Sequence, residues 1–165
     1  MKRLTAVALS AMALGAVASA RAQLPIPSLA IVGGVSHYDL SGTGSTPIGA
    51  LRVDIPLLSL VAEGSLGVMR PKEDVGTRTY IIPEAQLQYQ LFPMVIRPYL
   101  GAGAGLFKAI SGVDPHRSDL TVSAAAGVRA TMPLLGFGFR GEVRIRGIGS
   151  GFSGSATELT LGLSF

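Results

Sequence analysis

The chain has 165 residues, which is enough for one domain, and it contains no cysteine. The absence of cysteine excludes a disulfide framework, a cysteine-based zinc site and a thiol nucleophile. The formal net charge of +4 falls to +1 without residues 1–22, since eleven basic residues then face ten acidic ones, so the charge does not indicate a nucleic-acid partner.

The first segment, 1–22, has the layout of a secretory signal peptide. A short basic start, Met1-Lys2-Arg3, precedes an apolar run from Leu4 to Ala18, and the pattern Ala-x-Ala follows twice. The apolar run is short for a helix that crosses the ~30 Å hydrocarbon layer of a membrane. We therefore expect residues 1–22 to be a cleaved signal peptide and residues 23–165 to be the exported domain.

After residue 23, apolar residues recur at every second position, which is typical of β-strands. Three expected turns, near 56–58, 92–94 and 133–135, are short and contain proline, whereas 39–45, 70–78, 110–118 and 149–155 are longer and polar. Short and long connections alternate, so an up-and-down meander would have all long loops at one end and both termini at the other. The eight predicted strands are 28–38, 46–56, 59–69, 79–91, 95–107, 119–132, 136–148 and 156–165.

A soluble lipocalin-like barrel and a membrane barrel both show this alternation, with opposite faces turned outward. Lysine, the usual residue of a solvent-facing sheet, occurs after residue 22 only as Lys72 and Lys108, which we expect in or beside loops. Aromatic residues are expected to form two girdles around an apolar band, as in membrane barrels. The girdle near the short turns would contain Tyr89, Phe92, Phe137, Phe139 and Phe165, and the one near the long loops Tyr38, Tyr80, Phe107 and Phe152.

The charged residues of the predicted strands are expected to point into the lumen. Arginine forms fixed, bidentate pairs with carboxylates in confined spaces, so six arginines and five carboxylates would make a network of ion pairs. Eight strands leave an interior that side chains just fill, so we expect no wide channel. The predicted lumen residues are Arg52, Asp54, Glu63, Glu84, Arg97, Arg129, Arg140, Glu142, Arg144, Arg146 and Glu158.

The chain resembles the small outer-membrane β-barrel families of Gram-negative bacteria, of which the opacity-type proteins and the transmembrane domain of outer-membrane protein A are the nearest types. The resemblance rests on the leader, the eight strands, Arg97-Pro-Tyr-Leu-Gly-Ala-Gly-Ala-Gly105 and Leu161-Gly-Leu-Ser-Phe165. It implies an eight-stranded antiparallel up-and-down transmembrane β-barrel over 23–165, located in the outer membrane. It also implies that Leu161, Leu163 and Phe165 form an assembly signal for the barrel-assembly machinery.

Two motifs could suggest other chemistry. The segment Gly101-Ala-Gly-Ala-Gly105 superficially resembles a dinucleotide-binding loop. Such a loop must lead directly into a helix, whereas here the two-residue period of a strand continues through and beyond the segment. His37 and His116 would lie at the long-loop end, where we expect them to be solvated. His37 and its neighbour Ser36 would point to opposite faces of a strand, so they would not form a catalytic dyad.

We therefore expect a non-catalytic protein without cofactor or metal, which contributes to envelope structure or to surface contact through the loop 70–78. Its partners would be outer-membrane lipid and lipopolysaccharide, with no nucleic acid, and it would be a monomer. Three alternatives remain: a narrow, porin-like pore with mild anion preference set by Arg140, Arg144 and Arg146; a lipid-modifying enzyme at the outer rim; and a soluble, secreted lipocalin-like barrel.

Overall fold

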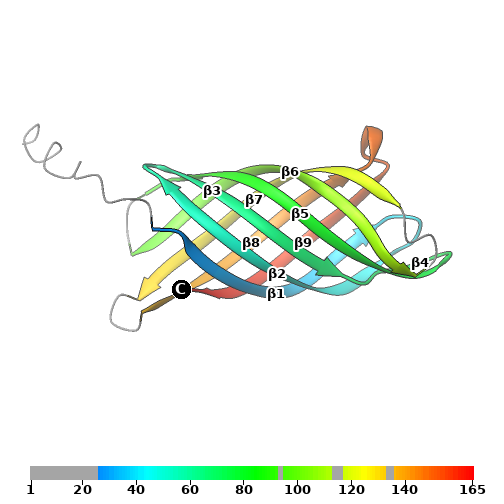
Figure 1. Ribbon diagram of the computed structural model, residues 1–165, viewed down its shortest axis with the longest axis horizontal. Helices are drawn as coiled ribbons and strands as arrows, with labels where there is room; N and C mark the ends of the chain where they lie inside the picture. The colour runs from blue at the N-terminus through cyan, green and yellow to red at the C-terminus, as the bar shows by residue number, and fades with distance from the viewer. Residues whose placement is uncertain (1–25, 93–94, 113–116, 133–135) are drawn as a thin grey trace, which may run out of the picture.

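The computed structural model describes residues 26–92, 95–112, 117–132 and 136–165, which form a closed antiparallel barrel (Figure 1). Each of the eight long strands pairs with both of its neighbours around the ring. A ninth, two-residue strand, β4 (Lys72–Glu73), pairs with the start of β5. The eight-stranded up-and-down prediction is confirmed. The barrel strands are β1 (Ser28–Asp39), β2 (Thr43–Leu57), β3 (Leu60–Met69), β5 (Gly76–Gln90), β6 (Ile96–Gly112), β7 (Ser118–Met132), β8 (Phe137–Ile148) and β9 (Gly154–Ser164).

The pairing of β1 with β9 closes the ring. Ten residue pairs join the two strands, from Ala30 with Ser164 to Asp39 with Ser155. Two further hydrogen bonds extend the pairing, because the Leu29 amide donates to the Phe165 carbonyl and the Phe165 amide donates to the Leu29 carbonyl. The barrel therefore has no open edge at this position, as hydrocarbon surroundings require.

The two faces of each strand differ in chemistry, because successive side chains point to opposite sides. In β8, Phe139, Val143 and Ile145 are 45–59% exposed on the outside, whereas Arg140, Glu142 and Arg144 are buried inside. Large apolar side chains of all the other long strands are also exposed outward. An apolar outer face with a polar interior is the arrangement of a transmembrane barrel and the reverse of a lipocalin. Along the described ranges, no helix is long and apolar enough to cross a membrane.

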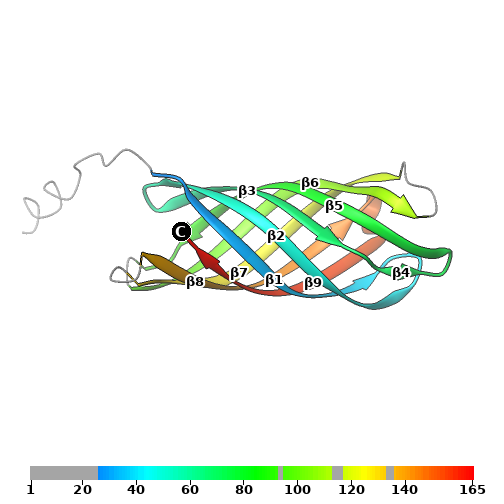
Figure 2. The ribbon, with the colours of Figure 1, turned by 60° about the horizontal axis from the view of Figure 1, so that its bottom comes forward.

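The two ends of the barrel are chemically distinct. The start of β1, the end of β9 and the short turn between β2 and β3 lie at the same end of the barrel, here called the short-turn end (Figures 1 and 2). The strand β4 lies at the opposite end, here called the loop end. The loops are shorter than predicted: 40–42 alone joins β1 to β2, and β6 continues to Gly112. The start of β2, Thr43-Gly-Ser45, is free of apolar residues, so hydropathy alternation could not reveal it. The turns predicted at 92–94 and 133–135 lie mostly outside the described residues.

The prediction of two aromatic girdles was half right. Tyr89, Phe92, Phe139 and Phe165 are exposed at the short-turn end, and Phe137 beside them is half-buried. At the loop end, Phe152 is exposed within a short 3-10 helix, η1 (Ser150–Phe152). However, the predicted members Tyr38, Tyr80 and Phe107 are buried inside the barrel. Each lies two residues from another inward-facing residue of its strand, and residues two apart in a strand share a face.

Lys108, which was expected in or beside a loop, lies within β6 on the outward face.

Candidate functional site

Arg144 lies at the centre of an ion-pair network in the lumen. It is supplied by β8, where Arg140, Glu142, Arg144 and Arg146 alternate with outward residues and therefore share the inner face. One guanidinium contacts three carboxylates: its Nη2 lies 2.9 Å from Glu63, its Nη1 2.6 Å from Glu84 and its Nε 2.9 Å from Glu142. This multiple pairing offsets the cost of burying charge.

Further ion pairs extend the network toward both ends. Toward the short-turn end, Arg140 pairs with Asp54, Glu63 and Glu142, and Arg129 lies 3.1 Å from Asp54. Arg52 lies 2.9 Å from Glu142. Toward the loop end, Arg146 pairs with Glu84 and, at 3.0 Å, with Glu158. The structure thus brings ten of the eleven predicted lumen residues into one network, while Arg97 lies at its short-turn end.

The sequence interpretation missed Tyr99, which joins several members of the network. Its hydroxyl donates to Glu142 Oε2 at 2.6 Å and accepts from Arg140 Nε at 3.1 Å. The guanidinium groups of Arg129 and Arg140 lie 5.1 and 5.4 Å from its ring centroid, within cation–π range. Tyr99 is two residues after Arg97 in an extended strand, so its place on the inner face could have been predicted.

Glycines in β6 and β7 make room for these side chains. A Cβ atom at Gly127 would lie 2.5 Å from the Tyr99 hydroxyl oxygen, and one at Gly101 would lie 2.9 Å from the Gln86 side chain. On the same face of β6, a Cβ atom at Gly103 would lie 2.9 Å from Glu84 Oε1 and 3.0 Å from Ser123 Oγ, so side chains of both neighbouring strands fill the space beside this glycine.

The lumen changes from polar to apolar near the loop end. A cluster of buried side chains, here called the apolar cluster, occupies its cross-section there. The rings of Tyr80 and Phe107 lie 4.1 Å apart between centroids, which is close packing. Apart from the hydroxyls of Tyr38 and Tyr80, which are bonded to Lys72 and Glu73, the side chains of the cluster offer water and ions no polar partner. The cluster comprises Tyr38, Ile48, Met69, Tyr80, Ile82, Phe107, Ala109, Ile148 and Ala156.

Beyond the apolar cluster, Glu73 of β4 is turned into the barrel. Its carboxylate is fully buried and accepts hydrogen bonds from Tyr80 at 2.5 Å, Ser41 at 2.6 Å and Arg78 at 2.8 Å. The Tyr38 hydroxyl holds the adjacent residue, since it donates to the Lys72 carbonyl and accepts from the Lys72 amide. These bonds fix the β4–β5 hairpin over the lumen.

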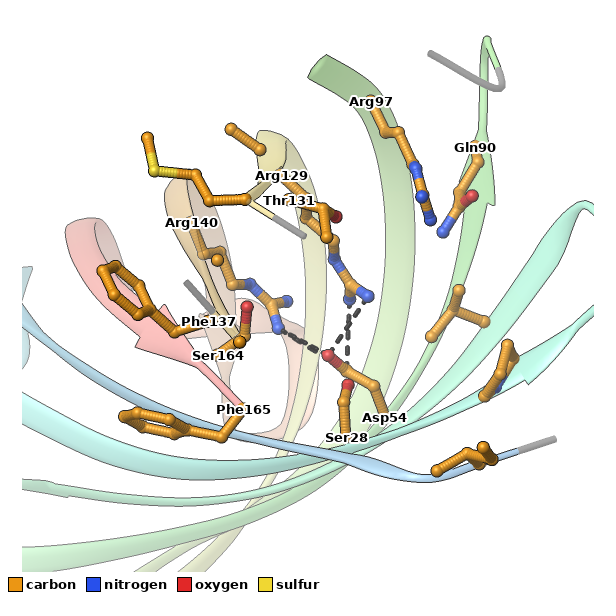
Figure 3. Close-up of a pocket in the computed structure, with 17 residues that line it drawn as sticks. Ser28, Asp54, Gln90, Arg97, Arg129, Thr131, Phe137, Arg140, Ser164 and Phe165 are labelled. Carbon is orange, nitrogen blue, oxygen red and sulfur yellow. Dashed lines mark hydrogen bonds and ion pairs between the residues drawn. The ribbon is translucent and has the colours of Figure 1, made fainter. Parts of the chain in front are cut away.

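A cavity of about 430 Å³ opens at the short-turn end (Figure 3). Arg97, Arg129 and Arg140 line it, and the carboxylate of Asp54 meets Arg129 and Arg140. Asp54 accepts hydrogen bonds from Arg129 and Arg140. Arg97 lies beside Gln90 in the same cavity (Figure 3).

The outer rim carries a Ser–His contact that the sequence did not indicate. His37 Nδ1 lies 3.2 Å from Ser45 Oγ on the neighbouring strand, and His37 is exposed on the outer face. Ser36 points inward and is fully buried, so the prediction that Ser36 and His37 face opposite ways is confirmed. Asp39 accepts a hydrogen bond from Thr43 rather than from His37 in the described contacts. His116 lies outside the described residues.

No protein-family model and no curated protein matches the chain. Solved structures do match it: Neisserial surface protein A aligns with a TM-score of 0.71 and 14% identity, over 84% of this chain and 95% of that one. The chain has the fold of the small outer-membrane β-barrels. This fold, predicted from the strand pattern, also appears in Ail, the attachment invasion locus protein of Yersinia pestis, with a TM-score of 0.54, 18% identity, and coverage of 84% and 97%. The outer membrane enzyme PagL has it too, with a TM-score of 0.55, 15% identity, and coverage of 85% and 99%.

Proposed function

We propose that this protein is a non-catalytic, integral outer-membrane barrel that contributes to envelope structure or surface contact and does not conduct solutes. The observation that carries the proposal is the double closure of the lumen. The ion-pair network around Arg144 fills its middle, and the apolar cluster with Glu73 above it fills the loop end. A narrow pore would need a continuous polar path, which the apolar cluster interrupts.

The outward apolar band and the fold shared with outer-membrane barrels support the location in the outer membrane of a Gram-negative bacterium. In that membrane the short-turn end would face the periplasm and the loop end the outside. Export would use residues 1–22 as a cleaved signal peptide, and that segment lies outside the described residues. Lipid, lipopolysaccharide and, during biogenesis, the barrel-assembly machinery would be its partners, and it would work as a monomer.

Surface contact would involve the loop end. Within the segment 70–78, Arg70, Lys72, Asp74 and Val75 are exposed, whereas Glu73 and Arg78 are turned inward and paired with each other. The exposed part is therefore smaller and less charged than the sequence indicates. The likeness to Ail, whose name describes attachment and invasion, supports a contact role for this end.

Conductance in a planar lipid bilayer tests the proposal. We expect the purified, refolded protein to give no steady conductance. A steady conductance whose ion preference reverses in Arg144→Glu, but not in the exposed control Arg70→Glu, would overturn the proposal and establish the pore. Folding of each variant is checked by its migration on gels before and after boiling.

A lipid-modifying enzyme at the outer rim is the second candidate, because the His37–Ser45 contact is exposed there. The shared fold with the outer membrane enzyme PagL adds to this candidate. The test is mass spectrometry of lipid A from cells that overproduce the protein. Under the non-catalytic proposal the lipid A stays unchanged, whereas a loss of acyl chains that Ser45→Ala abolishes would establish the enzyme.

A further inference from the structure

Exposed apolar side chains surround the short-turn end of the barrel. They belong to the strand ends and turns on that side, and their exposed fractions range from 39% at Leu91 and Met132 to 101% at Leu58. Large exposed apolar patches mark sites of contact with a protein or a membrane. This set of residues, here called the short-turn crown, comprises Ile26, Leu57, Leu58, Leu91, Phe92, Val95, Ile96, Met132 and Phe165.

Charge separates this end of the barrel from the loop end. Among the described residues of the short-turn end, no aspartate, glutamate, lysine or arginine side chain is exposed, and Arg97 and Arg129 are half-buried there. Toward the loop end, by contrast, the exposed charged residues are Asp39, Arg70, Lys72, Asp74 and Lys108. Charged side chains are the usual residues of a surface that faces water. The short-turn crown is therefore suited to less polar surroundings than the loop end.

The two-residue turn between β2 and β3, Leu58-Ser59, is unfavourable in water for two reasons. Leu58 is fully exposed, and its φ of 60° is a left-handed conformation that bulky side chains rarely adopt. Hairpin turns of this length usually place asparagine, aspartate or glycine at such a position. A backbone outlier of this kind points to a functional role for the residue. Here the role is to present an apolar side chain at the tip of the turn.

This turn lies at the level of the aromatic residues of the same end. Leu60, the first residue of β3, is directly opposite Leu57 on β2 and Tyr89 on β5. The Gln90 amide donates a hydrogen bond to the Ser59 carbonyl at 2.9 Å, which ties the turn to the end of β5. Aromatic belts of membrane proteins lie at the level of the lipid headgroups. The turn is therefore placed where headgroups and acyl chains meet.

The short-turn crown also continues the outward apolar band of the barrel. On β5, the exposed series Leu87, Tyr89 and Leu91 passes into Phe92 without a charged side chain. We propose that the crown is a membrane-binding surface, which inserts into the boundary between headgroups and acyl chains of the adjacent lipid leaflet. The inference rests on the outer-membrane barrel proposed above, because only a barrel in a membrane has a leaflet at this position. Lipid then surrounds Leu58, and the turns set the depth at which the barrel sits.

Tryptophan fluorescence tests the proposal, because the chain contains no tryptophan. The variants Leu58→Trp and Phe92→Trp are placed in nanodiscs, which leave both ends of the barrel open to water, with phospholipids brominated close to the headgroup. We expect bromine to quench most of the fluorescence of both variants, and their emission to lie at shorter wavelength than in water. The control Val75→Trp, at the exposed tip of the β4–β5 hairpin, should be neither quenched nor shifted. If Leu58→Trp fails to fold, Phe92→Trp still decides, since it exchanges one aromatic ring for another.

A further variant, Leu161→Trp in the outward band of β9, separates this proposal from the one on which it rests. Quenching in Leu161→Trp, together with unquenched and water-like emission in Leu58→Trp and Phe92→Trp, would overturn the membrane contact of the crown and leave the membrane barrel standing. Short-wavelength but unquenched emission in those two variants would also overturn it, because a second copy of the barrel would then cover the crown. No quenching in Leu161→Trp would contradict the membrane barrel itself.

Discussion

At the scale of single residues, Arg144 shows why the interior can hold so much charge. A buried ion is costly unless it is paired and hydrogen-bonded, and Arg144 contacts Glu63, Glu84 and Glu142 at once. These carboxylates contact other arginines in turn, so the charges are shared around the lumen. The network is consequently sensitive to the loss of a single member.

We expect Arg144→Met to destabilise the folded barrel by about 3–5 kcal/mol, because it leaves three buried carboxylates without one of their partners. The measurement is urea-induced unfolding in lipid vesicles, followed by gel migration. The control Arg70→Gln removes an exposed arginine and should change the free energy of unfolding by no more than about 0.5 kcal/mol. Equal effects of the two variants would show that the network does not hold the barrel together.

At the scale of single elements, β9 places its leucines at different depths of the membrane. Leu159 is opposite Val143 in mid-strand, whereas Leu163 is opposite Phe139 near the aromatic residues of the short-turn end. An outward arginine costs about 2–4 kcal/mol at the bilayer midplane and about 0–1 kcal/mol near an interface. We therefore expect Leu159→Arg to destabilise most, Leu161→Arg less and Leu163→Arg least, as measured by unfolding in vesicles. A flat series would contradict the assigned membrane position.

The β4–β5 hairpin is held over the lumen largely by Glu73. Because the chain has no cysteine, a single Ala109→Cys substitution in the fully buried apolar cluster provides a clean chemical probe. We expect a water-soluble maleimide to modify this cysteine slowly in the parent protein and faster when Glu73→Ala is added. The matched background is Asp74→Ala, since Asp74 is exposed next to Glu73. Equal rates in the two backgrounds would mean that Glu73 does not keep the loop end closed.

The elements also show how far sequence reasoning could reach. The two-residue period identified all eight barrel strands, because hydrocarbon demands one apolar face without exception. It misplaced Tyr38, Tyr80 and Phe107, because an apolar residue near a strand end suits either an interfacial girdle or an internal cluster. It also missed the inward turn of Glu73, which depends on contacts with Ser41, Arg78 and Tyr80 rather than on any local pattern.

At the scale of the whole molecule, the barrel is a single ring in which every long strand has two partners. Such a ring unfolds as a unit, because losing one pairing exposes edges that hydrocarbon cannot satisfy. We expect the purified protein to remain folded in dodecyl sulfate at room temperature and to migrate differently on gels after boiling. A water-soluble monomer without detergent would contradict the membrane barrel.

The pairing of β1 with β9 also determines the order of events when the protein is made. Ala30 finds its partner Ser164 only after the intervening residues have been synthesised. Until then β1 has an unpaired edge, which neither hydrocarbon nor a crowded aqueous compartment tolerates for long. Contacts between strands so distant along the chain also form slowly. Insertion into the membrane and closure of the ring are therefore coupled in time, and the first strand must be protected until the last one arrives.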